Sequence, residues 1–177
     1  MRALVSADTV RRFMDAMGRE AKGPGRIYLT GGATAVLEGW RASTVDLDLK
    51  LDPEPDGAFE AIARLKDELD VNVELASPDL FVPALPGWRE RSTFIGRFGE
   101  VDFFHFDPYT QALAKLERGH ERDVLDVTQM AARGMIDRVK LGTLFESVRA
   151  ELVRYPAIEA DRLRSIVLAF VDGGEPG

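Results

Sequence analysis

The stretch RIYLTGGATAVLEGWRASTVDLDLKL, residues 26–51, contains the features that decide the fold. Residues 26–30 form a short, largely apolar run that predicts a β-strand, and Gly31-Gly32 ends it. Residues 33–40 are typical of a short helix packed under that strand. Residues 45–51 then alternate between apolar and polar side chains without interruption, as in a second strand. The stretch therefore predicts a strand, a glycine turn, a helix and a second strand.

The second strand carries two carboxylates on one face. Successive side chains of a strand point to opposite faces, so Asp46 and Asp48 project from the same side. Two carboxylates held on a rigid backbone can bind one or two Mg²⁺ or Mn²⁺ ions, which prefer oxygen ligands. Gly31-Gly32 lacks Cβ atoms and lets a phosphate approach the main chain. Taken alone, the acidic pair is more typical of a strand whose polar face lies in water.

The rest of the chain divides into a mixed half and a helical half. A helix at 58–69 and strands at 71–75, 92–98 and 100–106 complete the first half. Asp107 followed by a proline is a strong helix start, and the chain beyond is helical. We expect an α/β core over residues 1–106, a helical region over 107–172 packed on the core, and a flexible tail over 173–177.

Composition limits the classes of function. The chain has no cysteine, which excludes disulfides and thiolate metal sites. No apolar run reaches the roughly 20 residues of a membrane helix, so we expect a soluble, cytoplasmic protein without a membrane partner. A net charge of −7 argues against wrapping a long nucleic acid by charge alone, although a local basic patch is compatible with it.

The order of Gly31-Gly32 and Asp46-x-Asp48 resembles the signature of the DNA polymerase β-like nucleotidyltransferase superfamily. Arg41 and Thr44 also fit the Arg-x-x-Thr that often precedes the acidic pair. The resemblance implies an α+β nucleotidyltransferase fold, with a mixed or antiparallel sheet flanked by helices and a C-terminal helical part. It implies that Asp46 and Asp48 bind Mg²⁺ or Mn²⁺, and that Gly31, Gly32 and Thr44 bind the nucleotide.

The superfamily has a third carboxylate on a neighbouring strand. Asp102 is our candidate, because an acidic residue among apolar neighbours is costly unless it is paired or bound to a metal. Glu100 and Glu74 are rivals for this position. An Asp near a hairpin turn is an equally good interpretation of Asp102.

A second block, residues 107–127, resembles a segment of bacterial nucleotidyltransferase-like proteins, including toxin components of abortive-infection-type toxin–antitoxin systems. By that resemblance Lys115 contacts the triphosphate, and Arg118 assists or contacts the acceptor. Asp123 positions one of these two cations. An amphipathic helix pair with surface ion pairs explains the same residues without a ligand.

These patterns predict a metal-dependent enzyme that moves a nucleoside monophosphate from an NTP to a hydroxyl of RNA (tRNA included), protein or a small molecule. A cognate antitoxin or toxin is the protein partner that the resemblance implies. The alternative is a protein that keeps the fold but binds without catalysis and acts through a protein partner.

Overall fold

The computed structural model describes residues 1–174, and its backbone forms two compact units. The first unit contains residues 1–77 and 92–106, and the second contains residues 78–91 and the chain from residue 107 onward. The loop at 78–91 therefore belongs with the helices. Of the tail predicted at 173–177, residues 175–177 lie outside the described residues.

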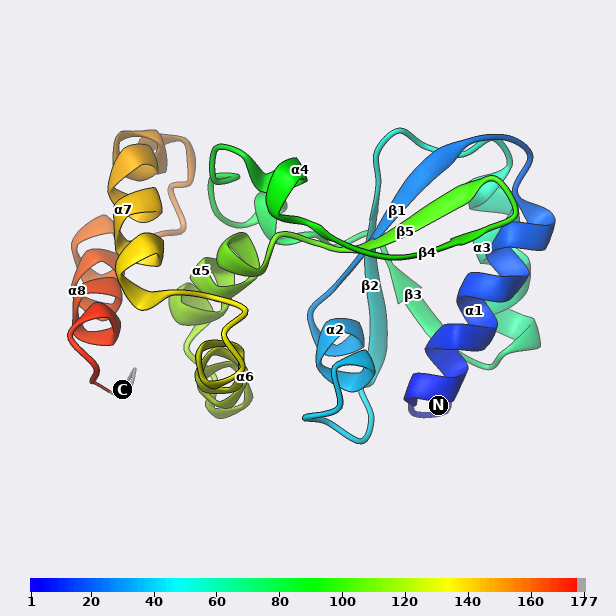
Figure 1. Ribbon diagram of the computed structural model, residues 1–177, viewed down its shortest axis with the longest axis horizontal. Coiled ribbons are helices and arrows are strands. Elements are labelled where there is room, and N and C mark those ends of the chain that lie inside the picture. Colours follow the sequence, from blue (N-terminus) through cyan, green and yellow to red (C-terminus); the bar gives the residue numbers. More distant parts are fainter. Residues whose placement is uncertain (175–177) are drawn as a thin grey trace. The chain divides into compact units, whose positions relative to one another are not determined.

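The first unit is built on a five-stranded sheet with the order β3-β2-β1-β5-β4 (Figure 1). Its strands are β1 (Gly25–Thr30), β2 (Asp46–Leu51), β3 (Asn72–Glu74), β4 (Thr93–Phe98) and β5 (Val101–His105). β1 is antiparallel to β2 and parallel to β5. β2 and β3 are parallel, and β4 and β5 form an antiparallel hairpin. The sheet is mixed, one of the two arrangements predicted from the sequence.

Helices pack on one face of this sheet. The first unit contains α1 (Ala7–Glu20), α2 (Gly32–Leu37) and α3 (Ala58–Glu68). The hydroxyl of Ser6 caps α1 by accepting a hydrogen bond from the backbone N–H of Thr9. The apolar residues of α1 and α3 share one buried cluster with the inward-facing residues of the strands, among them Ile27, Leu29, Leu47, Leu49 and Phe103.

The opposite face of the sheet carries Asp46 and Asp48, because they alternate with the buried leucines of β2. Aromatic side chains lie on the same face. Tyr28 of β1 stacks on Phe104 of β5 with ring centroids 5.3 Å apart, and Phe94 of β4 meets Phe104 edge-on at 5.4 Å. These cross-strand contacts tie β1, β5 and β4 together beside the acidic pair.

The second unit is helical. It contains α4 (Trp88–Arg91), α5 (Pro108–Arg118), α6 (Glu121–Ala132), α7 (Arg138–Val148) and α8 (Ala160–Val171). Two 3₁₀ helices, η1 (Pro78–Leu80) and η2 (Arg149–Arg154), complete it. Gly119 ends α5 in the left-handed conformation with φ 69°, a conformation that glycine adopts without a Cβ penalty.

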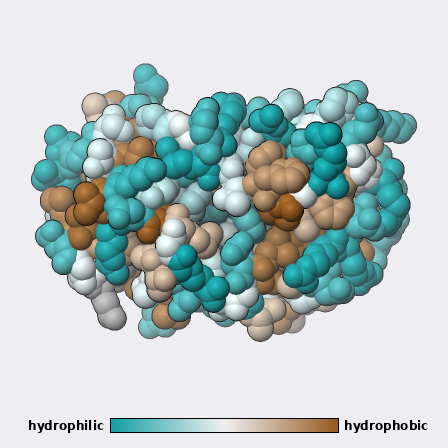
Figure 2. Space-filling view, viewed as in Figure 1, coloured by the Kyte–Doolittle hydropathy of each residue, from teal (hydrophilic) through white to brown (hydrophobic). Residues whose placement is uncertain are grey.

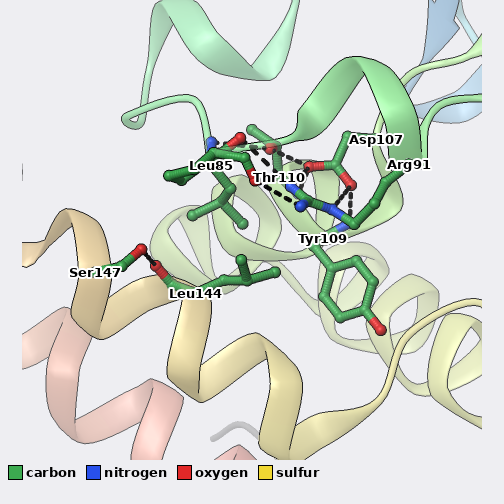
Figure 3. A network of polar contacts seen from close by, with 8 residues as sticks. Leu85, Arg91, Asp107, Tyr109, Thr110, Leu144 and Ser147 are labelled. Carbon is green, nitrogen blue, oxygen red and sulfur yellow. Dashed lines mark hydrogen bonds and ion pairs between the residues drawn. The ribbon is translucent and has the colours of Figure 1, made fainter.

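A largely buried ion pair fastens the 78–91 loop to the start of α5 (Figure 3). The guanidinium of Arg91 donates to both carboxylate oxygens of Asp107, at 2.9 and 2.7 Å, and also to the backbone oxygen of Leu85. Asp107 is the predicted cap of α5, and it accepts from the backbone N–H groups of Tyr109 and Thr110. The cap of α5 therefore also anchors the preceding loop.

The predicted fold class is confirmed: a mixed sheet with helices on it, followed by a helical part. Figure 2 shows apolar side chains in separate groups among hydrophilic ones on the face in view. Within residues 1–174, no helix has the length and apolar character needed to cross a membrane.

Candidate functional site

The Gly31-Gly32 turn lies directly against the acidic strand. Gly31 has φ 60° and ψ −125°, a conformation that side chains with a Cβ rarely adopt. A Cβ atom built on Gly31 would lie 3.1 Å from Oδ2 of Asp48. The turn and the carboxylate predicted to share a site are therefore close neighbours, with room for little more than a glycine between them.

Gly32 is required by a second neighbour. A Cβ atom on Gly32 would overlap the side-chain hydroxyl and Cβ of Thr44. Thr44 is held in turn by Val5, since the two residues exchange backbone hydrogen bonds of 2.8 and 2.9 Å. The predicted residues Gly32 and Thr44 thus pack on each other, and the chain before α1 fixes their position.

Asp46 and Asp48 share the sheet face with two residues of β3. The parallel register places Asp46 beside Asn72 and Asp48 beside Glu74. The side-chain amide of Asn72 donates to Oδ1 of Asp46 at 2.7 Å and to Oε1 of Glu74 at 2.9 Å. Asn72 therefore links the carboxylates of Asp46 and Glu74 and orients Asp46. The alternation of side chains along the strands did not reveal this role.

The structure does not bring Asp102 to this group. Asp102 pairs with Arg26 across β1, whereas Asp48 pairs with Thr30, four residues further along. At about 3.3 Å per residue the two positions are roughly 13 Å apart along the strand. The carboxylate of Asp102 accepts two hydrogen bonds from Arg97, at 2.7 and 2.9 Å, and the bonds from Arg97 lower its pKa.

Of the two rivals for the third carboxylate, Glu74 lies at the acidic pair and Glu100 lies in the turn between β4 and β5. Among residues 1–174, no group of three or more histidine or acidic side chains stands close enough to hold a metal ion by itself. Asp46 and Asp48, with Glu74 beside Asp48, form the acidic part of this face.

Thr30 also belongs to the site, although the sequence patterns did not single it out. It is the last residue of β1, it is 2% exposed, and it lies directly opposite Asp48 in the antiparallel register. Its hydroxyl is buried, and within the described chain it has no hydrogen-bond partner. The sequence feature that could have identified Thr30 is its position directly before Gly31, at the end of the strand.

In the second unit, Lys115 is a buried cation. Its ammonium group lies 2.6 Å from Oδ2 of Asp126 and 3.6 Å from Oδ1 of Asp123, and all three side chains are buried. Asp126 was missing from the predicted site, although it follows Asp123 by three residues and so shares its helix face. Lys115 is therefore bound by two carboxylates of α6.

Arg118 is the exposed member of the same network. Its guanidinium donates to both oxygens of Asp123, at 2.7 and 2.6 Å, while its side chain remains 58% exposed. Burial raises the pKa of Asp123, but the hydrogen bond from Arg118 and the charges of Lys115 and Arg118 outweigh it, so the pKa is lowered overall. Asp123 thus contacts both predicted cations.

His105 lies on the helix-covered face and holds α2. Its Nδ1 is 3.1 Å from the Thr34 hydroxyl, and its Nε2 is 3.0 Å from Oε1 of Glu38. Burial lowers the pKa of His105, against the opposing influence of the Glu38 carboxylate. Thr34 lies in α2, which starts at Gly32, and Glu38 is the C-cap of α2. His105 therefore holds α2 and, through it, the Gly31-Gly32 turn that precedes it.

A mixed sheet whose first strand ends in a Gly-Gly turn, packed against an Asp-x-Asp strand, defines a protein of the nucleotidyltransferase class. The comparison of the sequence with family models agrees with this class. The chain belongs to the family described as "Nucleotidyltransferase of unknown function (DUF6036)", whose model matches residues 9–173. Comparison with curated proteins and with solved structures gave no match.

Proposed function

We propose that this protein is a metal-dependent enzyme that transfers a nucleoside monophosphate from an NTP to a hydroxyl acceptor. The observation that carries the proposal is the close approach of Gly31 to Asp48, on the face that also presents Asp46. A glycine turn leaves the main chain accessible to a phosphate, and the neighbouring carboxylate is a group that binds cations.

The residues present fit a divalent cation such as Mg²⁺. Mg²⁺ sites in enzymes of phosphoryl chemistry use one or two carboxylates, with substrate phosphates and water completing the coordination. Asp46 and Asp48 supply these two carboxylates, and Glu74 stands beside Asp48 as the third acidic residue. A metal held there supplies neutralisation of phosphate charge and orientation for in-line displacement at phosphorus.

The chain's own residues then have distinct roles. Asn72 donates a hydrogen bond to Asp46 and keeps one carboxylate oxygen in place. Outer partners of this kind orient the groups that bind a metal. The Gly31-Gly32 turn receives the nucleotide phosphates, and Thr44 and His105 hold that turn from two sides.

We assign different roles to the two cations of α5, Arg118 and Lys115. Arg118 has an exposed guanidinium and contacts the triphosphate or the acceptor. Lys115 is a compact buried charge paired with Asp126 and close to Asp123, and it helps to hold the carboxylate that Arg118 also contacts. The acceptor is a hydroxyl of RNA, of protein or of a small molecule, and the reaction takes place in the cytoplasm.

The test is the double substitution Asp46→Asn plus Asp48→Asn. Transfer of label from each α-labelled NTP to RNA and to protein is measured with Mg²⁺ and with Mn²⁺. We expect the double variant to lose transfer and metal-dependent nucleotide binding while it keeps its fold by circular dichroism. A matched control, Asp15→Asn plus Asp67→Asn, removes two exposed carboxylates of the same unit and should behave as the wild type. Undiminished turnover in the Asp46/Asp48 variant would sink the proposal.

A second candidate is a protein of this fold that binds without catalysis, as one half of a toxin–antitoxin pair. The observation in its favour is the burial of Lys115 between Asp126 and Asp123, an arrangement that is complete without a ligand. Calorimetry with each NTP separates the two candidates. Metal-dependent nucleotide binding that disappears in the Asp46/Asp48 variant supports the enzyme, and its absence in the wild type supports the binding protein.

A further inference from the structure

Thr30 has a buried hydroxyl that satisfies no group of the protein. Its side-chain oxygen is enclosed, and within residues 1–174 no donor or acceptor lies in hydrogen-bonding position. Buried polar groups are almost always paired, because an unpaired group loses its bonds to water without replacement. A valine of nearly the same shape would avoid that cost. A hydroxyl at this position therefore requires an explanation.

The location of Thr30 suggests one. Thr30 is directly opposite Asp48 in the antiparallel ladder and is joined covalently to Gly31. Directly opposite residues of antiparallel strands have Cβ atoms about 5 Å apart. Asp48 and Gly31 are both partly accessible. A ligand that rests on these two residues is therefore a neighbour of Thr30.

Thr34 provides the contrast within the same unit. Like Thr30, it is buried, at 1% exposed, and it lies close to the glycine turn. The hydroxyl of Thr34 donates to the backbone oxygen of Leu29 at 3.4 Å and meets Nδ1 of His105 at 3.1 Å. Its hydroxyl is explained by the fold, whereas the hydroxyl of Thr30 is not.

We propose that Thr30 is a ligand-binding residue whose hydroxyl donates a hydrogen bond to a phosphate oxygen of the nucleotide. The inference rests on the proposed function and adds a phosphate contact to it. A hydroxyl can donate to an anion, and a bond to a charged oxygen in a desolvated position is stronger than a neutral one. The adjacent Gly31 has no side chain that would block the phosphate.

The experiment compares Thr30→Val with Thr30→Ser in the full chain. Binding of magnesium–ATP and of magnesium tripolyphosphate is measured by calorimetry, and thermal unfolding is measured without ligand. We expect Thr30→Val to weaken both probes by about tenfold or more, the factor of one hydrogen bond to a charged group. Its melting temperature should be unchanged or higher, since the wild-type hydroxyl has no partner to lose. Thr30→Ser should keep the affinity.

Thr34→Val is the matched control for unfolding. It removes a hydroxyl that has partners, so its melting temperature should fall. A Thr30→Val protein that melts lower but binds both probes normally would show that the hydroxyl serves the fold, and would overturn the inference. Weakened ATP binding with unchanged tripolyphosphate binding would place the contact on the sugar or base and overturn it as well.

The two levels of the proposal fail differently. If the Asp46→Asn plus Asp48→Asn variant loses metal-dependent ATP binding while Thr30→Val keeps it, only the role of Thr30 is wrong. If the wild type binds ATP without metal dependence, the proposed function fails and the role of Thr30 fails with it.

Discussion

Gly31 faces the carboxylate of Asp48 so closely that a methyl group added to Gly31 would stand 3.1 Å from Oδ2. Gly31 directly follows β1 and Asp48 lies within β2, so the two residues are brought together by the pairing of these strands. The surroundings of these two residues decide which substitutions should weaken ligand binding and which should change stability alone.

Gly31→Ala should impair nucleotide binding more than an alanine at another glycine with positive φ does. An alanine with positive φ costs on the order of 1 kcal/mol or more of stability. Gly39→Ala is the matched control, because Gly39 has φ 86° but a methyl group added to it would meet nothing within 4 Å. We expect similar losses of stability by urea unfolding. Only Gly31→Ala should reduce the affinity for a metal–NTP complex, and equal affinities in the two variants would contradict this interpretation.

Asn72→Ala should lower metal affinity without unfolding the protein. The variant removes the donor that orients Asp46, and loss of such outer partners typically weakens metal binding by about 10- to 100-fold. Titration with Mn²⁺ followed by electron paramagnetic resonance measures the affinity directly. Asn72→Asp is informative as well, because it keeps the size but places a further negative charge beside Asp46. A wild-type Mn²⁺ affinity in Asn72→Ala would argue against a metal at this face.

Glu74→Gln and Asp102→Asn should separate the two candidates for the third carboxylate. Glu74 lies beside Asp48, so Glu74→Gln should lower nucleotide transfer by about tenfold or more, as loss of a group that binds or orients a metal does. Asp102 is engaged by Arg97, whose side chain is 67% exposed, and exposed ion pairs contribute about 0–1 kcal/mol. Because Asp102 is also roughly 13 Å from Asp48 along the strand, Asp102→Asn should leave nucleotide transfer nearly unchanged. The reverse result would restore Asp102 as the third carboxylate.

Lys115→Met and Arg118→Gln should differ in kind. Removal of one partner from a buried ion pair costs about 3–5 kcal/mol, and Lys115 is the buried partner of Asp126. Lys115→Met should thus lower the free energy of unfolding strongly. Arg118→Gln should cost less, because its guanidinium is exposed and Asp123 keeps Lys115 as a neighbouring cation. It should instead raise KM for the NTP or the acceptor. Unchanged kinetics in Arg118→Gln would remove Arg118 from the site.

His105 should make stability fall as the pH falls below about 6.5, the ordinary pKa of histidine. Burial lowers the pKa of His105 in the folded state, so the unfolded chain takes up the proton first. The stabilisation is therefore complete above about pH 6.5 and declines toward the lower pKa of the folded state. Urea unfolding between about pH 5.5 and 7.5 measures the slope across that window. His105→Gln should flatten the slope, and an unchanged slope in this variant would contradict the assignment to His105.

Local features of this fold were predictable from the sequence where they depend on residues close together in the chain. The alternation of residues 45–51 predicts β2 and the shared face of Asp46 and Asp48, and Asp107-Pro108 predicts the start of α5. Gly99 predicts the turn of the β4–β5 hairpin, where it has φ 59°. In each case the backbone geometry is set by side-chain period or by a residue type with a special conformation.

The candidate site was less predictable, because its partners depend on strand register. The sequence shows that Asn72 and Glu74 share one face of β3. It does not show that β3 pairs with β2 in parallel, which brings them to Asp46 and Asp48. The same limit explains Asp102, whose distance from Asp48 follows from the pairing of β1 with β5. Lys115 was recognisable as a helix cation, but its burial against Asp126 is a tertiary contact.

The backbone exchange between Val5 and Thr44 bears on where the working protein has to start. The matched family region begins at residue 9, after Val5, yet Val5 anchors the threonine that packs on Gly32. A protein trimmed to residues 9–173 keeps most of α1 and the whole sheet. It loses the two backbone hydrogen bonds by which Val5 holds Thr44 against Gly32. Recombinant versions therefore need the first residues intact, and affinity tags are better placed at the other terminus.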